Sequence, residues 1–269
     1  MQEIAHHPPP LRRDYAAPSV FRPENLLREA RRQKALPTLP IPEICVLDPD
    51  GDLVRRLVAE RRASLCPGWP CYHTSLHVFE HAGETLGVVG CAVGSSFAVL
   101  VAEQLFALDC RFLISITSAG QLRQNGQPPY FVLIDRALRD EGTSSHYLPP
   151  ALFAEANPGL VAAIMPSVSR TCLTVLAGPT WTTDAPFRET ETAISQARAH
   201  GALAVEMEAA ALYAFARARN RAVICFAHVT NQMAQIEGDF EKGAANGALD
   251  ALDLLAATAR GWRTVDRAR

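Results

Sequence analysis

The sequence lacks an apolar run long enough to cross a membrane, and its first fifteen residues carry no hydrophobic signal core. We therefore expect a cytoplasmic protein. It also lacks a strong charge of either sign: the formal net charge of its 269 residues is −2, which gives no basis for a nucleic-acid surface. The hydrophobic content of 48% is typical of a globular chain.

The cysteines and histidines lack the spacing of a metal site. The seven cysteines are an odd number, and Cys66 and Cys71 are separated by four residues with no second pair after them. His73, His77 and His81 are four residues apart, but their segment reads as strands, in which this spacing does not form a helical metal-binding face. The sequence therefore predicts neither a disulfide framework nor a metal centre.

The chain also has no internal repeat, and its two parts differ in composition. Residues 1–42 are rich in proline and contain one predicted helix, at 23–35, so we expect an N-terminal extension with a disordered tip. Residues 43–269 form a single predicted domain in which β-branched apolar runs alternate with helical ones. The predicted strands are 43–48, 76–80, 85–93, 111–117, 129–135, 171–178 and 221–230, and the predicted helices are 94–108, 186–199, 207–219 and 246–259.

This alternation predicts an α/β architecture with a mostly parallel central sheet. In such sheets ligands bind where strands end and helices begin. One such junction reads Glu206-Met207-Glu208 and leads directly into an alanine-rich helix. A carboxylate at a helix start is favoured by the macrodipole, which accounts for one glutamate but not readily for two. A carboxylate can also accept two hydrogen bonds from vicinal hydroxyls, and a thioether offers an apolar face to a sugar ring. The junction therefore suits a ribose.

The stretch VEMEAAALY, residues 205–213, resembles the signature of the nucleoside phosphorylase-I superfamily. That superfamily includes hexameric purine nucleoside phosphorylases, uridine phosphorylases and methylthioadenosine nucleosidases. The resemblance extends over about residues 43–262. It implies a single-domain α/β/α sandwich with a mixed, barrel-like central sheet, and a homo-oligomer between dimer and hexamer. It also implies that Met207 and Glu208 bind ribose, with Glu206 nearby.

Two further junctions resemble the phosphate-binding elements of this family. Gly51 to Arg55 matches the Gly-Asp-x-x-Arg loop, in which glycine lets backbone amides approach an anion and arginine adds a charge-assisted contact. The alternative is an ordinary Asp-Gly turn before a helix. Ser118 and Gly120 match the pattern Arg-x-Gly-Thr/Ser-x-Gly, but Ser115 stands at its arginine position. Because that arginine contacts phosphate in the phosphorylases, its absence leaves hydrolysis by water open.

The base-recognition segment of the family corresponds to residues 178–190. Trp181 is expected either to stack on a flat heterocycle or to pack in the core, and Arg188 or Thr183 to read the base edge. Gly120 and Asn231 complete the expected base site. Purine-cleaving members carry aspartate at the Asn231 position, whereas uridine phosphorylases carry asparagine. An amide offers a hydrogen bond but no catalytic proton, so the residue favours pyrimidine nucleosides or a purine enzyme that uses another acid.

The expected function is phosphorolysis of a uridine-like or purine nucleoside, giving free base and ribose 1-phosphate. Asn231 and Arg55 are the expected catalytic residues, and Gly51, Arg55 and Ser118 bind inorganic phosphate, the co-substrate. Positioning and electrostatics suffice for this reaction, so no metal or organic cofactor is expected. The alternatives are a nucleosidase and a non-catalytic nucleoside-binding paralogue. We expect no nucleic-acid or membrane partner.

Overall fold

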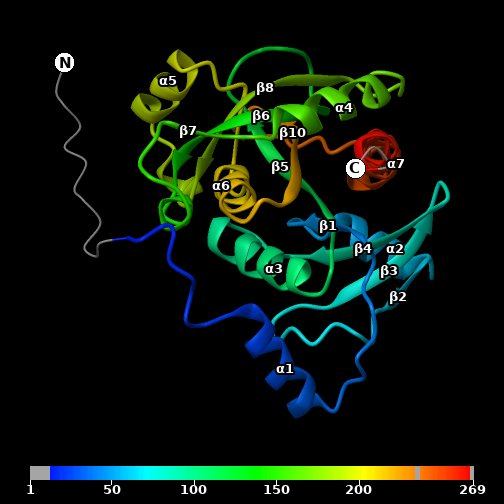
Figure 1. Ribbon diagram of the computed structural model, residues 1–269. Helices are drawn as coiled ribbons and strands as arrows, with labels where there is room; N and C mark the ends of the chain where they lie inside the picture. The colour runs from blue at the N-terminus through cyan, green and yellow to red at the C-terminus, as the bar shows by residue number, and fades with distance from the viewer. Residues whose placement is uncertain (1–12, 234–236, 267–269) are drawn as a thin grey trace.

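The structure is a computed structural model that describes residues 13–233 and 237–266 (Figure 1). Its helices are α1 (Pro23–Lys34), α2 (Asp52–Ala59), α3 (Ser95–Ala107), α4 (Pro158–Val168), α5 (Glu191–Ala199), α6 (Ala209–Arg219) and α7 (Ala248–Asp266), with short 3₁₀ turns η1 (Ser144–His146), η2 (Pro186–Arg188) and η3 (Ala244–Gly247). Its strands are β1 (Ile44–Asp48), β2 (Ala63–Leu65), β3 (Leu76–His81), β4 (Glu84–Gly90), β5 (Phe112–Gln121), β6 (Tyr130–Asp140), β7 (Phe153–Glu155), β8 (Val175–Thr183), β9 (Ala204–Glu206) and β10 (Ala222–Asn231).

Five of the strands close into a barrel. β10 pairs with both β5 and β6, and the ring is completed by the pairs β6–β8, β8–β9 and β9–β5. From β5 the sheet continues outward through β1, β4, β3 and β2, while β7 adds to β6. Parallel and antiparallel pairs both occur around the ring, so the mixed, barrel-like sheet is confirmed and a mostly parallel one is not.

The most apolar runs of the sequence form the centre of this sheet. Every residue of β1 is buried, as is β10 from Val223 to its end. Helices pack in pairs around the sheet, α4 against α7 and α3 against α6 (Figure 1). Residues 209–216 of α6 are all buried, because small alanine side chains let this helix lie close to the barrel. The Tyr213 hydroxyl fixes the helix by donating to the carbonyl oxygen of Ile134 at 2.6 Å.

Some element boundaries differ from the sequence prediction. β8 ends at Thr183 instead of 178, so Trp181 lies in a strand. Helix α5 begins at Glu191, because the backbone first makes the η2 turn and Thr190 then caps the helix by accepting from the backbone N–H of Ala193 at 3.3 Å. Helix α4 was not predicted, although Asn157 is a regular N-cap that accepts from the two following free amides.

The predicted helix of the N-terminal extension is present as α1. Its buried residues Leu27 and Ala30 face the domain, and the helix packs against α3. The expected disordered tip lies in residues 1–12, outside the described residues. Within the described part of the chain, no helix is long and apolar enough to cross a membrane.

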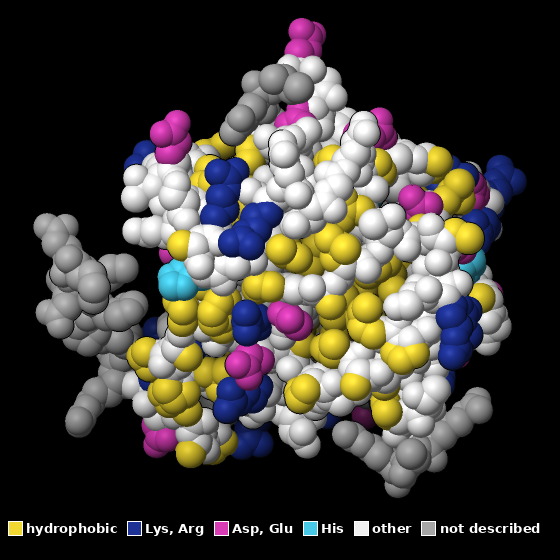
Figure 2. Space-filling model, turned by 90° about the horizontal axis from the view of Figure 1, so that it is seen from above, with side chains coloured by type: hydrophobic (Ala, Val, Ile, Leu, Met, Phe, Trp, Pro, Cys, Tyr) yellow, Lys and Arg dark blue, Asp and Glu magenta, His cyan; other side chains and the backbone are white. Residues whose placement is uncertain are grey.

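One face of the molecule shows apolar side chains gathered at its centre, with charged side chains toward its rim (Figure 2). This is the side on which β8 and α4 lie in Figure 1. The expected homo-oligomer stays a prediction.

Candidate active site

The loop after β1 turns sharply at Gly51. Its φ of +74° is a left-handed conformation, and a Cβ atom here would lie 2.7 Å from both Arg55 Nη1 and Cys91 Sγ. Glycine is therefore favoured by the backbone, and a larger residue would displace the Arg55 and Cys91 side chains. The Arg55 guanidinium folds back onto the loop, donating to the carbonyl oxygen of Asp50 at 2.8 Å and to Asp52 Oδ1 at 2.7 Å. The structure thus brings Gly51 and Arg55 together, as the loop motif predicts.

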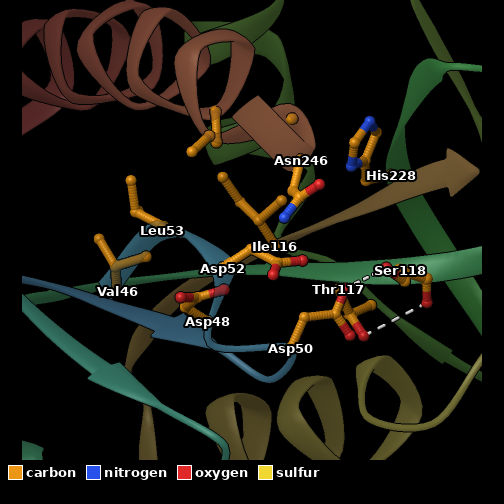
Figure 3. A pocket seen from close by; sticks show the side chains of 13 residues that line it. Val46, Asp48, Asp50, Asp52, Leu53, Ile116, Thr117, Ser118, His228 and Asn246 are labelled. Atoms are coloured by element: carbon orange, nitrogen blue, oxygen red, sulfur yellow. Dashed lines mark hydrogen bonds between the residues drawn. The ribbon is translucent and has the colours of Figure 1, made fainter. Parts of the chain in front are cut away.

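Two more side chains reach the same loop from distant parts of the chain. Ser118 on β5 donates its hydroxyl hydrogen bond to Asp50 Oδ2 (Figure 3). Lys242, in the segment before α7, donates to Asp50 Oδ2 at 2.8 Å and to Asp52 Oδ2 at 2.6 Å. We refer to Asp50, Asp52, Arg55, Ser118 and Lys242 as the Asp50 network. Lys242 was missed by the sequence reasoning, because nothing in its local sequence indicates a contact with residues some 190 positions earlier.

A small pocket adjoins the Asp50 network, and Asp48, Thr117 and His228 are among its lining residues (Figure 3). His228 is buried and stacks on Phe131 with ring centroids 4.5 Å apart. Its Nε2 atom is buried without a hydrogen-bond partner among the described residues. Burial lowers the pKa of His228 to about 4, so the imidazole is neutral at pH 7. Burial also raises the pKa of Asp48 to about 6.

The two glutamates of the Glu-Met-Glu junction have different roles. Glu206 Oε1 accepts from the hydroxyls of Thr180, at 3.1 Å, and Thr182. Its Oε2 accepts from the backbone N–H groups of Glu208 and Ala209, each at 2.7 Å, at the start of α6. The carboxylate therefore serves the helix end, as the capping alternative expects. Both oxygens of Glu206 are thus engaged, which favours the capping alternative over the predicted contact with ribose.

Glu208 is equally buried but only half satisfied. Its Oε1 accepts from the backbone N–H of Gly94 at 2.7 Å, whereas its Oε2 is buried without a hydrogen-bond partner among the described residues. Burial, followed by the neighbouring charge of Glu206, raises the pKa of Glu208 to about 7. Met207 is partly exposed, and its carbonyl oxygen accepts from the Ser95 hydroxyl at 2.7 Å. The start of α3 thus holds this junction in place.

The ribose and anion elements predicted from the sequence are neighbours in space. The short connection from β4 to α3 touches both, since Cys91 lies beside Gly51 and Arg55 while Gly94 binds Glu208. On β5, Thr117 lies close enough to Glu208 to lower its pKa, and the next residue, Ser118, belongs to the Asp50 network.

Trp181, the predicted stacking residue of the base site, is buried and therefore poorly accessible to a base. Trp181 is only 4% exposed and packs in a second hydrophobic cluster with Leu122, Leu138, Ala197, Ala202 and Val205. Its indole N–H donates to Asp140 Oδ2 at 2.9 Å. This arrangement corresponds to the core-packing alternative. Arg188 is exposed on η2, and its side chain makes no hydrogen bond or ion pair within the described residues.

Asn231 and Gly120 lie opposite each other at the ends of β10 and β5. The Asn231 side chain is buried, donates to Thr230 Oγ1 at 3.1 Å and accepts from the backbone N–H of Met233 at 2.9 Å. A Cβ on Gly120 would lie 2.8 Å from Met233 Sδ and 3.3 Å from Asn231 Oδ1. Glycine therefore leaves the space that this amide occupies, and the structure brings the two predicted residues together.

Comparison with known proteins places the chain in a family. Residues 43–260 match the family model described as the phosphorylase superfamily, and because the match spans most of the chain, the protein belongs to that superfamily. No curated protein matches the chain.

Among solved structures, the chain is similar to the uridine phosphorylase from Vibrio fischeri ES114 complexed with 6-hydroxy-1-naphthoic acid. The TM-score is 0.68 at 21% identity, covering 86% of this chain and 97% of that one. A further structure of uridine phosphorylase from Vibrio fischeri ES114 gives a TM-score of 0.67 at 22% identity, covering 82% and 91%. At these identities the likeness establishes a shared fold.

Proposed function

We propose that the protein cleaves the N-ribosidic bond of a nucleoside and releases the free base. The observation that carries this proposal is the free, buried Oε2 of Glu208 beside the partly exposed Met207. A buried carboxylate oxygen without a partner is costly, so a ligand that supplies donors is favoured. The vicinal hydroxyls of a ribose supply two donors, and the thioether provides an apolar surface for the ring. Membership of the phosphorylase superfamily supports the same chemistry.

The nucleophile that attacks the ribose remains to be assigned, and phosphate, which makes the reaction a phosphorolysis, is the first candidate. The residues proposed to bind phosphate are Gly51, Arg55 and Ser118. Gly51 and Arg55 lie in the loop after β1 and the helix turn that follows it, Ser118 contacts this loop, and the Glu208 carboxylate lies nearby. Phosphate would attack the anomeric carbon as the base leaves, giving ribose 1-phosphate. The uridine phosphorylases of the same fold and the asparagine at position 231 support a uridine-like substrate.

Hydrolysis is the second candidate, and one observation specifically favours it. The Ser118 hydroxyl and the Arg55 guanidinium, both proposed phosphate donors, are engaged by the carboxylates of Asp50 and Asp52. In addition, the buried Ser115 occupies the arginine position of the family pattern and supplies no charge. Water would then be the nucleophile, and the products would be ribose and free base.

The test is an incubation of the protein with a panel of purine and pyrimidine nucleosides, with and without phosphate, followed by chromatography of base and sugar products. Base release that is lost in Glu208→Ala and kept in Glu80→Gln, an exposed carboxylate on β3, is the expected result. Base release with normal turnover in Glu208→Ala would refute the ribose assignment. No release from any nucleoside would refute N-ribosidic cleavage of these substrates and favour a nucleoside-binding protein.

A further inference from the structure

Asp50 lies where the predicted anion donors converge. Ser118, which was predicted to bind phosphate, and Lys242, which was not, both donate to the same oxygen, Asp50 Oδ2. The neighbouring carboxylate of Asp52 takes the second contact of Lys242 and the ion pair with Arg55. An oxygen that accepts from both a hydroxyl and an ammonium group is bound in the way a phosphate oxygen is usually bound in proteins.

The charges of the Asp50 network leave no attraction for a further anion. The two cationic side chains, Arg55 and Lys242, are matched by the two carboxylates of Asp50 and Asp52. The buried carboxyl of Asp48 lies in the wall of the same pocket and adds negative charge when ionised. Phosphate could reach Ser118 and Lys242 only by displacing Asp50, and it would then stand next to like charges.

We propose that Asp50 is a specificity-determining residue whose carboxylate occupies the position of the anionic nucleophile, so that this enzyme delivers water instead of phosphate to the ribose site. This inference rests on the proposed N-ribosidic cleavage and selects the hydrolytic candidate over the phosphorolytic one. In the reaction, the water oxygen forms the bond to the anomeric carbon, and the N-ribosidic bond breaks with its electron pair leaving on the base. The proton that water loses is balanced by the proton that the base takes up.

Lys242 has a defined part in this arrangement. It belongs to residues 237–247, the described stretch before α7, in which Gly243, Ala245 and Asn246 have positive φ angles. The Lys242 side chain is 26% exposed. Its ammonium group holds the carboxylates of Asp50 and Asp52 through ion pairs. Lys242 thereby keeps Asp50 against Ser118, and it is a positioning residue for the carboxylate.

A purely structural ion pair would also hold this segment to the loop, so the variants must separate occupancy from charge. Asp50→Asn keeps the shape of the side chain and removes its charge, and Asp50→Ala clears the position next to Ser118. Asp52→Asn is the matched control, because it removes one charge from the same network and leaves Asp50 on Ser118. Circular dichroism and thermal unfolding establish that each variant is folded.

The first measurement is binding of inorganic phosphate by isothermal titration calorimetry. The wild-type protein and Asp52→Asn are expected to bind phosphate weakly, Asp50→Ala at least about tenfold more tightly, and Asp50→Asn with intermediate affinity, because its amide still fills the position next to Ser118. Equal gains in the Asp50 and Asp52 variants would show that net charge decides, which would overturn the proposal. Tight phosphate binding by the wild-type protein would overturn it without any variant.

The second measurement is base release with and without phosphate, using a nucleoside that the wild-type protein cleaves. We expect phosphate to leave the wild-type rate unchanged, and to stimulate Asp50→Asn or Asp50→Ala with formation of ribose 1-phosphate. Strict dependence of the wild-type enzyme on phosphate would overturn the role of Asp50 and leave N-ribosidic cleavage standing. Absence of base release from every protein would instead refute the proposed function, and phosphate binding would still decide the inference about Asp50.

Discussion

Replacement of Glu208 by glutamine changes one buried charge and preserves the shape of the side chain. The amide oxygen can still accept from the backbone N–H of Gly94, the contact that Oε1 makes at 2.7 Å. The side chain no longer titrates, whereas in the wild-type protein burial and the charge of Glu206 raise the pKa of Glu208 from 4.5 to about 7. The variant therefore isolates the consequences of that single pKa shift.

The difference in free energy of unfolding between the wild-type protein and Glu208→Gln must depend on pH. Between the pKa in the unfolded chain and the pKa in the folded protein, folded Glu208 holds more proton than unfolded Glu208, so the wild-type free energy of unfolding falls as pH rises. The loss amounts to about 3 kcal/mol once the pH exceeds 7. Glutamine has no such loss. We expect Glu208→Gln to be the more stable protein at about pH 8, with the advantage fading toward about pH 4.5.

The activity of the same variant should change in the opposite direction. A carboxylate accepts hydrogen bonds from two hydroxyls, and each bond to a charged group contributes about 1.5–3 kcal/mol. Loss of one such contribution lowers kcat/KM by roughly 10- to 100-fold. Wild-type kcat/KM should rise with pH through about 7 as Glu208 ionises, and this rise should be missing in the variant.

Urea denaturation of both proteins from about pH 5 to about pH 8 measures the stability difference, which reports the titration of Glu208 together with its effect on the neighbouring Glu206. A difference that does not vary with pH would refute the reasoning, because Glu208 would then titrate at the same pH in the folded and unfolded chains. A glutamine variant that is less stable at the alkaline end would refute it as well, since the buried charge would then be well solvated by the protein.

The remaining predictions concern three other positions. Glu206→Gln should lower the free energy of unfolding by about 2–4 kcal/mol, because its amide NH₂ would face donors that the carboxylate now satisfies; denaturant titration checks this. Trp181→Phe should cost about 2–3 kcal/mol, because the hydrogen bond to the Asp140 carboxylate is lost and a buried ring is replaced by a smaller one, while KM for the nucleoside stays unchanged; a large rise in KM would restore the stacking role. Gly51→Ala should destabilise the protein by about 1–3 kcal/mol, measured by thermal unfolding, since its φ is +74°.

The fold could be predicted where local pattern and burial agree. The uninterrupted apolar runs that became β1 and β10 identify central strands, and their buried neighbours confirm that position. The end of β8 was predicted too early, because Gly178-Pro179 reads as a turn. In the structure Pro179 lies where the register between β6 and β8 shifts, so its missing N–H interrupts the ladder without ending the strand.

The candidate site was predictable only in its local motifs. Short sequence motifs indicate the chemistry of Gly51, Arg55 and Glu208. In the structure these motifs are neighbours, because both contact the connection from β4 to α3. Lys242 carries no such local signal, because its partners are determined by the return of the chain over the barrel. The hydrogen bond from Ser118 to Asp50 is likewise a tertiary contact, between residues 68 positions apart in the sequence.

Glu206 and Glu208 make different contacts, which explains why the junction contains two glutamates. The free amides at the start of α6 would attract any nearby carboxylate, and a single glutamate would be held by them. Glu206 takes the N–H groups of Glu208 and Ala209, which leaves Glu208 beyond the helix end with one oxygen on Gly94 and the other free. The charge of Glu206 also contributes to the raised pKa of Glu208. The capping residue therefore leaves the second carboxylate clear of the helix end, and its charge adds to the burial that raises the pKa of that carboxylate.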